Sequence, residues 1–487
     1  METLVPPANE ERVADADITA AIDMLFLTKK GVISHLMDVA TQEGIVELSG
    51  FTDNLLSRER AEEIALAVRG VRGVINDLII RTSHVPDAEL QRHVARALLD
   101  NPATGDYEVR GTVANGAVTL SGTVQSWAEK GLVLRVIQGV RGVHSIEAEA
   151  LTIPGDTIQN SDEEITTQIR ELLDWDIRVN SALVQVLTID QVVYLAGLIG
   201  TAAEKARIAV IAYQAGASRV ETHDLVVAHW ALGRQLRRDK FAHRLDADIV
   251  RAVRDTFRYD PSVLSSEPLV QVRNGVVTLA GTINNLRAKQ AAEQDARNVV
   301  GVRDVHNLLK VRTEHLSPDG DIRQTIVDAL SRDPYVGHVE FSINVRNGQA
   351  SLYGRVNDHF EAEQAGEVAA GVNCVVEVQN RVEVLGSTSL NRFSSLPQSA
   401  PALHRTAGPN PDYALAERIR MRYCWSASLH DQEVEVRAED GRVTLTGTVD
   451  TWLDRKQAAL DAYEVGARDV NNHLRVTTDP APPARYL

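Results

Sequence analysis

A short hairpin pattern recurs six times along this chain of 487 residues and restricts the folds it can adopt. In its clearest copy, Asn274-Gly275 precedes the run Val276-Val277-Thr278-Leu279-Ala280-Gly281. Asn-Gly favours a type I′ turn, because both central residues of that turn need positive φ. After the turn, Val277, Leu279 and Gly281 fall on one face by alternation, which is typical of a strand with one buried face. This copy therefore predicts a β-hairpin.

The other five copies keep the order of turn, alternating strand and closing glycine. Three have an intact turn pair, namely Asn115-Gly116, Asn347-Gly348 and Asp440-Gly441. Two are degraded: Gly44 lacks the preceding Asn, and Asp190-Gln191 lacks the glycine. The closing glycines are Gly50, Gly122, Gly197, Gly281, Gly354 and Gly447, spaced by 72, 75, 84, 73 and 93 residues. These glycines and the turn glycines Gly116, Gly275, Gly348 and Gly441 are interpreted as structural.

Each hairpin lies between two helical patterns and is followed by a third strand pattern. The first helix has an apolar stripe, as in Ile249, Val253 and Phe257, which indicates one buried face. The second helix begins at capping boxes such as Ser126 with Glu129, and we expect it to end on glycines that include Gly139 and Gly371. The predicted unit is α-β-β-α-β, a two-layer sandwich with both helices on one face of a three-stranded mixed sheet. The fold class is therefore α+β, as a tandem array.

The composition of the chain restricts the cellular compartment and the binding partners that we expect for the protein. The net charge of −16 makes the chain a poor general binder of polyanions, because its overall field repels phosphate. The start of the chain lacks the pattern of a secretory signal, and no run is long enough for a transmembrane helix, so we expect a cytoplasmic protein. Cys374 and Cys424 lie in different repeats and are expected to be reduced thiols without a zinc spacing.

The repeat resembles the BON domain (bacterial OsmY and nodulation), through its NGxVxLxGxV hairpin and its GVxxVxNxL/V ending. The resemblance covers residues 15–82, 86–152, 161–228, 244–313, 318–385 and 411–477. It implies non-catalytic modules of cell-envelope and stress-response proteins, with a suggested role in phospholipid or protein binding. Six copies without an export signal depart from the commoner form of the family.

Several patterns in the sequence resemble active or binding sites. Gly70-Val71-Arg72-Gly73 matches the GXXG loop of an RNA-binding KH module, but that loop joins two helices, whereas here it joins a helix to a strand. The 14 histidines stand at different places in different repeats, so no metal set, nucleophile motif or phosphate loop recurs. We therefore predict no catalytic residues, no metal and no cofactor.

One basic segment interrupts the acidic chain between the third and fourth repeats. Its candidate contact residues are Trp230, Arg234, Arg237, Arg238, Lys240 and Arg244. Three interpretations remain: a helix between repeats whose arginines pair with acidic neighbours, a contact with anionic lipid, or a contact with nucleic acid, which is the least favoured.

The predicted function is a non-enzymatic scaffold or binding protein, linked to stress by resemblance, that self-associates into a homo-oligomer or filament through exposed strand edges. The alternative is a peripheral membrane protein that binds anionic phospholipid. Residues 386–412 are rich in Ser, Pro and Asn and are interpreted as a flexible linker, so that the array would divide into repeats 1–3, 4–5 and 6. The tail at 479–483 is expected to be disordered.

Overall fold

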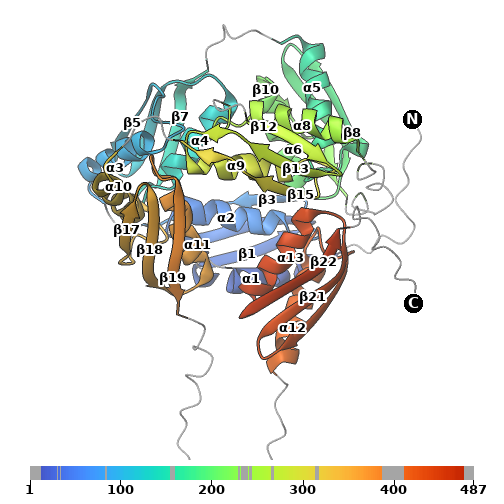
Figure 1. Cartoon of the computed structure of the whole chain (residues 1–487). Coiled ribbons are helices and arrows are strands. Elements are labelled where there is room, and N and C mark those ends of the chain that lie inside the picture. The colour runs from blue at the N-terminus through green and yellow to red at the C-terminus, as the bar shows by residue number, and fades with distance from the viewer. Residues whose placement is uncertain are drawn as a thin grey trace, which may run out of the picture.

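The computed structural model has six consecutive units of the order helix, strand, strand, helix, strand (Figure 1). The structure describes residues 13–29, 31–32, 34–82, 85–153, 160–228, 231, 240, 244–264, 268–312, 317–385 and 411–476. Most of the expected linker at 386–412, and the tail at 479–483, lie outside the described residues. The α+β class and the repeated mixed sheets confirm the fold predicted from the sequence.

Each unit contains two helices. The first helices are α1 (Asp15–Thr28), α3 (Asp87–Asp100), α5 (Asp162–Trp175), α8 (Asp246–Arg258), α10 (Asp319–Arg332) and α12 (Pro411–Trp425). The second helices are α2 (Leu55–Leu66), α4 (Trp127–Gln138), α6 (Ala202–Gln214), α9 (Leu286–Arg297), α11 (His359–Ala370) and α13 (Trp452–Glu464). Side-chain caps form as expected, for example in α6, where the Thr201 hydroxyl accepts from the Glu204 amide and the Glu204 carboxylate accepts from the Thr201 amide.

Each unit also contains a hairpin and a third strand. The hairpins pair β1 (Met37–Gln42) with β2 (Ile45–Thr52), β5 (Val109–Ala114) with β6 (Ala117–Thr123), β8 (Val184–Ile189) with β9 (Val192–Ile199), β12 (Leu269–Arg273) with β13 (Val276–Ala280), β17 (Ser342–Arg346) with β18 (Gln349–Val356), and β20 (Glu433–Glu439) with β21 (Arg442–Val449). The third strand is β3 (Gly73–Asn76) and β4 (Ile79–Ile80), β7 (Ser145–Thr152), β10 (Arg219–Glu221) and β11 (Leu225–Val227), β15 (Asp304–Asn307) and β16 (Lys310–Val311), β19 (Glu377–Val384), or β22 (Asp469–Val476). A short strand, β14 (Thr282–Ile283), continues β13 and pairs with β16.

The sheet of every unit has the same topology. The two hairpin strands are antiparallel, and the third strand lies parallel to the second hairpin strand, which therefore occupies the centre. In the sixth unit, Val443 and Leu445 of β21 face the helices and are fully buried. Small residues on the second helix, here Ala458 and Ala462, let that helix lie close to the sheet. Each unit thus contributes its own apolar core, and the cores of the first and third units merge into one cluster.

The hairpin turns have the backbone that the sequence predicts. Asn274 and Gly275 have φ of 52° and 76°, as a type I′ turn requires. The degraded third copy keeps this geometry without glycine, since Asp190 and Gln191 have φ of 49° and 61°.

A carboxylate that was not predicted from the sequence supports each turn. In the fourth unit, Asp246 at the start of α8 accepts from the backbone amides of Asn274 at 2.8 Å and Gly275 at 2.9 Å. The same two bonds occur in all six units, always 28 and 29 residues apart, from Asp15, Asp87, Asp162, Asp246, Asp319 and Asp412. Each such bond ties the first helix to the hairpin and satisfies amides that the tight turn leaves free.

The recurrent glycines do not all have the same backbone conformation. Gly354 does not have the positive φ of the other closing glycines, but a side chain there would collide with the Phe341 ring. Gly139 and Gly371 close their helices with negative φ. The left-handed residue after the second helix is Gly142 in the second unit and Cys374, at φ of 66°, in the fifth.

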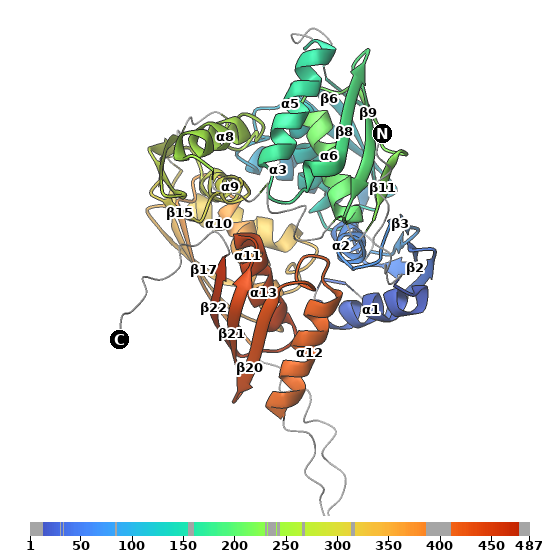
Figure 2. The ribbon, with the colours of Figure 1, turned by 90° about the vertical axis from the view of Figure 1, so that its right-hand side faces the viewer.

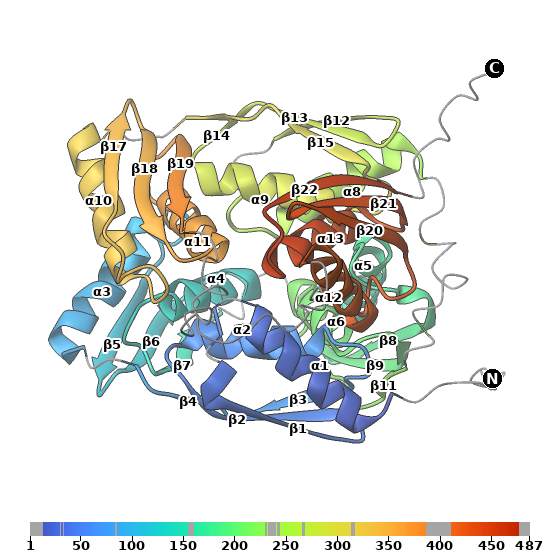
Figure 3. The ribbon, with the colours of Figure 1, turned by 90° about the horizontal axis from the view of Figure 1, so that it is seen from below.

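The six units pack into one body in which distant parts of the chain meet (Figures 2 and 3). In Figure 3 the second helices gather toward the middle, and most sheets lie around the outside. Backbone hydrogen bonds join unit 1 to unit 6 (Arg69 N to Trp425 O, 3.1 Å), unit 2 to unit 5 (Arg141 N to Arg332 O, 2.8 Å) and unit 3 to unit 4 (Ile177 N to Asn298 O, 2.9 Å). This nested pairing crosses the division into repeats 1–3, 4–5 and 6 that the linker suggested.

Candidate functional site

The outer face of the third unit's sheet is unusually apolar. Leu187 of β8 lies opposite Tyr194 of β9, and Ile189 lies opposite Val192. Leu187, Ile189 and Tyr194 are 57%, 50% and 41% exposed. On the other side of β9, Leu198 pairs with Val226 of β11, which is also exposed. We call these six side chains the outer patch of unit 3.

The other units show what this face ordinarily carries. The positions of Leu187 and Tyr194 are Thr112 and Thr119 in unit 2, Gln271 and Thr278 in unit 4, Asn344 and Ser351 in unit 5, and Arg437 and Thr444 in unit 6. Unit 1 has Ala40 and Glu47. Since the fold of the unit tolerates polar residues at these positions, the apolar side chains of unit 3 are not needed for its core.

The sequence already contained a signal for the outer patch. The runs Val186-Leu187 and Val192-Val193-Tyr194-Leu195 place apolar residues on both faces of the hairpin, in place of strict alternation. A strand that is apolar on both faces is typical of a buried strand. Here one of those faces is exposed, which favours a contact surface.

The basic segment predicted to contact lipid or a partner is placed only in part. Trp230, Arg234, Arg237 and Arg238 lie outside the described residues. Lys240 is 6% exposed, and its ammonium donates to the carbonyls of Leu173, Asp176 and Val179 at the end of α5.

Arg244 also turns inward. Its guanidinium pairs with Asp174 at 3.2 Å and lies 4.9 Å from the ring centre of Trp175. Lys240 therefore caps a helix instead of presenting a charge to a membrane, and Arg244 joins the ends of units 3 and 4.

Buried ion pairs lie where the paired units meet. In unit 3, Asp176 forms an isolated backbone bridge with Val299 of unit 4, and its carboxylate accepts from Arg178 at 2.7 Å and from Arg207 at 2.8 Å, both within unit 3. Burial alone would raise the pKa of Asp176, but the hydrogen bonds and charges of the two arginines hold that pKa well below its ordinary value.

Where units 1 and 6 meet, burial outweighs the neighbouring positive charges in its effect on the pKa of the buried carboxyl. Arg422 is 2% exposed; it donates to Asp461 at 2.9 Å and to the Thr28 hydroxyl at 3.0 Å. Burial raises the pKa of the Asp461 carboxyl more than Arg422 and Lys29 lower it. These residues line a cavity of about 460 Å³ where units 1, 3 and 6 meet. Its arginines have carboxylate partners, and the ion pairs of Lys29 and Arg60 with Glu464 join units 1 and 6.

Three further features concern metal binding, membrane crossing and the cysteines. Among the described residues, no cluster of three or more His, Cys, Asp or Glu side chains is arranged to hold a metal ion. Over the same part of the chain, no helix combines the length and apolar character needed to cross a bilayer. Cys374 is buried and Cys424 is exposed, and neither forms a disulfide.

Comparison with known families gives six matches. The BON domain profile matches residues 14–82, 86–154, 161–228, 245–313, 318–386 and 411–478. These segments are the six units of the structure and account for most of the chain.

Known proteins match over shorter stretches. The chain is 27% identical over 145 residues to osmotically-inducible protein Y of Escherichia coli K12, an alignment that covers 28% of this chain and 72% of that protein. Two solved structures are also similar. CdsD, a structural protein of the type III secretion system of Chlamydia trachomatis, is 16% identical, with coverage of 47% and 94% and a TM-score of 0.13. The PrgH periplasmic domain is 13% identical, with coverage of 44% and 98% and a TM-score of 0.12.

Proposed function

Because the chain belongs to the BON-domain family, we propose that it is a non-catalytic scaffold that binds protein through the outer patch of unit 3. The observation that carries this proposal is the contrast between units: at the two cross-strand pairs Leu187–Tyr194 and Ile189–Val192, only the third unit is apolar throughout. Apolar side chains held on a flat sheet can pack against a second sheet about 10 Å away.

We propose a second copy of the chain as the partner. An apolar sheet face is self-complementary, so two copies related by a twofold axis can bury the same patch on both sides. The face of a three-stranded sheet six residues long covers roughly 300 Å², which is less than the roughly 800 Å² per partner of a stable interface. The association is therefore weak and depends on concentration.

Light scattering coupled to size exclusion tests this proposal over a range of protein concentrations. We expect the mass of the native chain to rise above the 53.3 kDa of one chain as concentration increases. L187K/Y194K should remain monomeric, because two buried charges cannot be accommodated between sheets. The matched control T112K/T119K places the same charges on unit 2 and should behave as the native chain. A mass near 53.3 kDa for the native chain at all concentrations would refute self-association.

Anionic phospholipid remains the alternative partner, through the basic segment. Two of its six residues, Lys240 and Arg244, use their charges within the protein, which weakens this alternative. Flotation of the chain with vesicles that contain or lack anionic lipid decides it.

The cellular setting is also part of the proposal. The exposed free thiol of Cys424 suits a reducing compartment such as the cytoplasm, and cell fractionation tests this location. The match to osmotically-inducible protein Y supports a stress-related role, which measuring the protein's abundance before and after an osmotic shift would test.

A further inference from the structure

The outer face of unit 1 carries a second apolar surface. Ile45 of β2, Ile75 of β3 and Ile79 of β4 are exposed on this face. Ile79 lies opposite Phe51 of β2, and the Arg81 guanidinium lies 3.3 Å from the centre of the Phe51 ring. We call Ile45, Phe51, Ile75 and Ile79 the outer patch of unit 1.

The other units show that these apolar residues are unusual. The residue after the closing glycine and its partner on the third strand are apolar only in units 1 and 3, as Phe51–Ile79 and Leu198–Val226. The same pair in the remaining units is Thr123–Thr152, Thr282–Lys310, Arg355–Glu383 and Thr448–Arg475. The position of Ile75 carries Glu147, Glu221, His306, Gln379 and Asn471. Since the unit folds with polar residues at these positions, the outer patch of unit 1 is not needed for its core.

The outer patches of units 1 and 3 lie on the same side of the molecule. In Figure 2, β2 and β3 of unit 1 and β9 and β11 of unit 3 lie on the right. In Figure 3, the sheets of both units lie below their own helices. The apolar cores of the two units form one cluster, so their packing fixes one sheet relative to the other. The two outer faces can therefore meet one partner at the same time.

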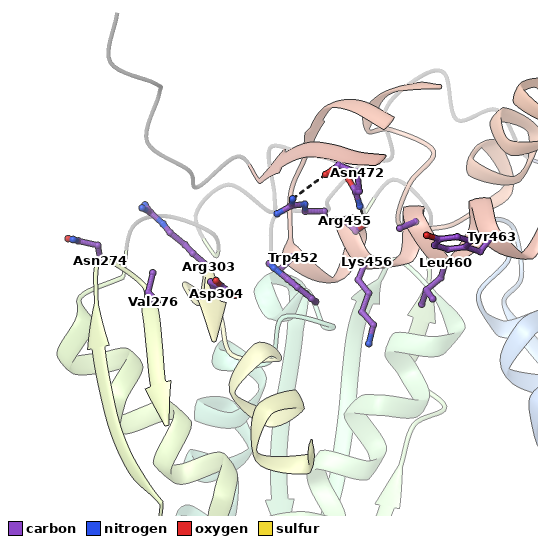
Figure 4. A pocket seen from close by; sticks show the side chains of 11 residues that line it. Asn274, Val276, Arg303, Asp304, Trp452, Arg455, Lys456, Leu460, Tyr463 and Asn472 are labelled. Carbon is purple, nitrogen blue, oxygen red and sulfur yellow. Dashed lines mark hydrogen bonds between the residues drawn. The ribbon is translucent and has the colours of Figure 1, made fainter. Parts of the chain in front are cut away.

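The cleft of about 700 Å³ between units 4 and 6 is a different kind of surface (Figure 4). Its wall includes Trp452 of α13, but the Arg297 guanidinium lies 4.0 Å from the centre of that ring. Arg303 and Lys456 also line the cleft, and their charged ends point away from each other in Figure 4. The cleft thus separates its charges and shares its tryptophan with a cation, whereas units 1 and 3 present apolar side chains on open sheet faces.

The geometry points to a single interface that covers the outer patches of units 1 and 3 together, with a second copy of this chain as the partner. This inference rests on the proposed self-association through unit 3 and adds a second contact to it, on unit 1. In a twofold arrangement, each copy presents both faces to the other, so that both patches are buried on both copies. Such an arrangement closes at the dimer.

The area of the two faces favours this larger interface. One sheet face covers roughly 300 Å², and two cover roughly 600 Å². Specific interfaces begin at about 600 Å² per partner, so the two faces together reach this limit, whereas unit 3 alone does not. Interfaces are only a little more than half apolar. Polar groups on the two faces, such as Glu47 and the ion pair of Arg219 with Glu221, are therefore compatible with the contact.

Light scattering coupled to size exclusion tests the contribution of unit 1. The mass of the native chain should level off at twice that of one chain as concentration rises. I75K/I79K should raise the dissociation constant of the dimer by about tenfold or more, because it would bury charges between sheets. The matched control T123K/T152K places the same charges on the outer face of unit 2 and should associate as the native chain does. Circular dichroism checks that both variants keep their fold.

Carbene footprinting tests the same surface on the native chain, without a substitution. Photochemical labelling of the peptide that contains Ile75 and Ile79 should decrease when the concentration rises above the midpoint of dimer formation. The peptide that contains Leu187 and Tyr194 should lose labelling over the same range. Peptides from the outer face of unit 2 should be labelled equally at all concentrations.

The outcomes distinguish this inference from the proposed function. If the native chain associates and I75K/I79K associates equally well, unit 1 lies outside the interface, and the inference is overturned while the contact through unit 3 stands. Unchanged labelling of Ile75 and Ile79 on association has the same meaning. A native chain that stays monomeric overturns both proposals. A mass that rises beyond two chains overturns the closed twofold arrangement, and protection that appears only with added cell extract assigns the face to another protein.

Discussion

A single aspartate at the start of the first helix positions the hairpin turn in every unit. Its two carboxylate oxygens accept from consecutive turn amides at 2.8 to 3.1 Å. Hydrogen bonds to a charged acceptor contribute about 1.5–3 kcal/mol each when buried, and less here because the turn is partly exposed. The constant separation of 28 residues was visible in the sequence. It was overlooked because acidic residues are common in the first turn of helices for another reason, the helix dipole.

We predict that Asp246→Asn destabilises unit 4 by about 1–2 kcal/mol, because an amide side chain can accept from only one of the two turn amides. Hydrogen exchange of the Asn274 and Gly275 amides should become faster. Asp248→Asn is the matched control: it lies in the same helical turn, but its carboxylate pairs only with the exposed Arg251 among the described residues. Equal exchange rates in the two variants would contradict this role of Asp246.

Two of the closing glycines distinguish the strain of a positive φ from the steric collision of an added side chain. Gly447 and Gly281 have similar φ, 124° and 118°. An added Cβ at Gly447 would collide with the Glu433 carbonyl oxygen, whereas at Gly281 its nearest neighbour is 4.0 Å away. Gly447→Ala should therefore cost about 1–3 kcal/mol more than Gly281→Ala, measured by denaturant unfolding. Similar losses in both variants would show that φ alone sets the requirement for glycine.

At the scale of elements, the ends of helices form the joints between units. In each pair, the end of a first helix meets the segment after a second helix of the partner. A buried charge lies at each of these joints, namely Asp176, Arg332 and Arg422. A buried charge that loses its partner destabilises a protein by about 3–5 kcal/mol, whereas removing both charges together costs much less.

We predict this behaviour for Arg422 and Asp461 of unit 6, which lie at the joint with unit 1, where Arg422 donates to the Thr28 hydroxyl. Arg422→Leu should destabilise the protein by about 3–5 kcal/mol because Asp461 stays buried without its main partner. R422L/D461L should recover a large part of that loss. A double-mutant cycle by chemical denaturation measures the difference, and a double variant less stable than the single one would contradict the prediction.

Asp176, which lies beside the joint of units 3 and 4, should give the stability of the protein a dependence on pH. Its pKa in the folded protein is lowered, so the stability that its carboxylate contributes is present above the ordinary pKa of about 4. That stability is lost as the pH falls through the lower, folded value. The difference in unfolding free energy between native protein and Asp176→Asn should thus be largest at pH 7 and shrink below about pH 4. A difference that is unchanged at pH 3 would refute this.

At the scale of the whole molecule, six units form one body. A compact chain of this length has a radius of gyration of about 23 Å, and a string of separate domains would be considerably larger. Small-angle X-ray scattering of the monomer at low concentration should give a value close to the compact one. A much larger radius would show that the pairs of units separate in solution.

The sequence was sufficient for the unit but not for the assembly. Hairpins, caps and buried stripes are local patterns that recur along the chain, so a degraded copy could be interpreted from the others. The outer patch of unit 3, with Leu187 and Tyr194, is visible in the sequence, because its strands depart from the strict alternation of apolar and polar residues. The contacts between distant units left none. Arg69 and Trp425, for example, come from units 1 and 6, and residues that meet across such a contact share no spacing in one sequence.

The nested pairing implies an order of events during synthesis. Units 3 and 4 are neighbours in the chain, so they can dock while the rest is still being translated. Units 2 and 5 can meet next, and unit 1 must wait until unit 6 has emerged before Arg69 finds the Trp425 carbonyl. Assembly therefore proceeds from the middle units outward. Unit 1 is translated first and is the last unit to dock on its partner. A chain that is released before unit 6 has been translated therefore contains a unit 1 that has no unit 6 to dock on.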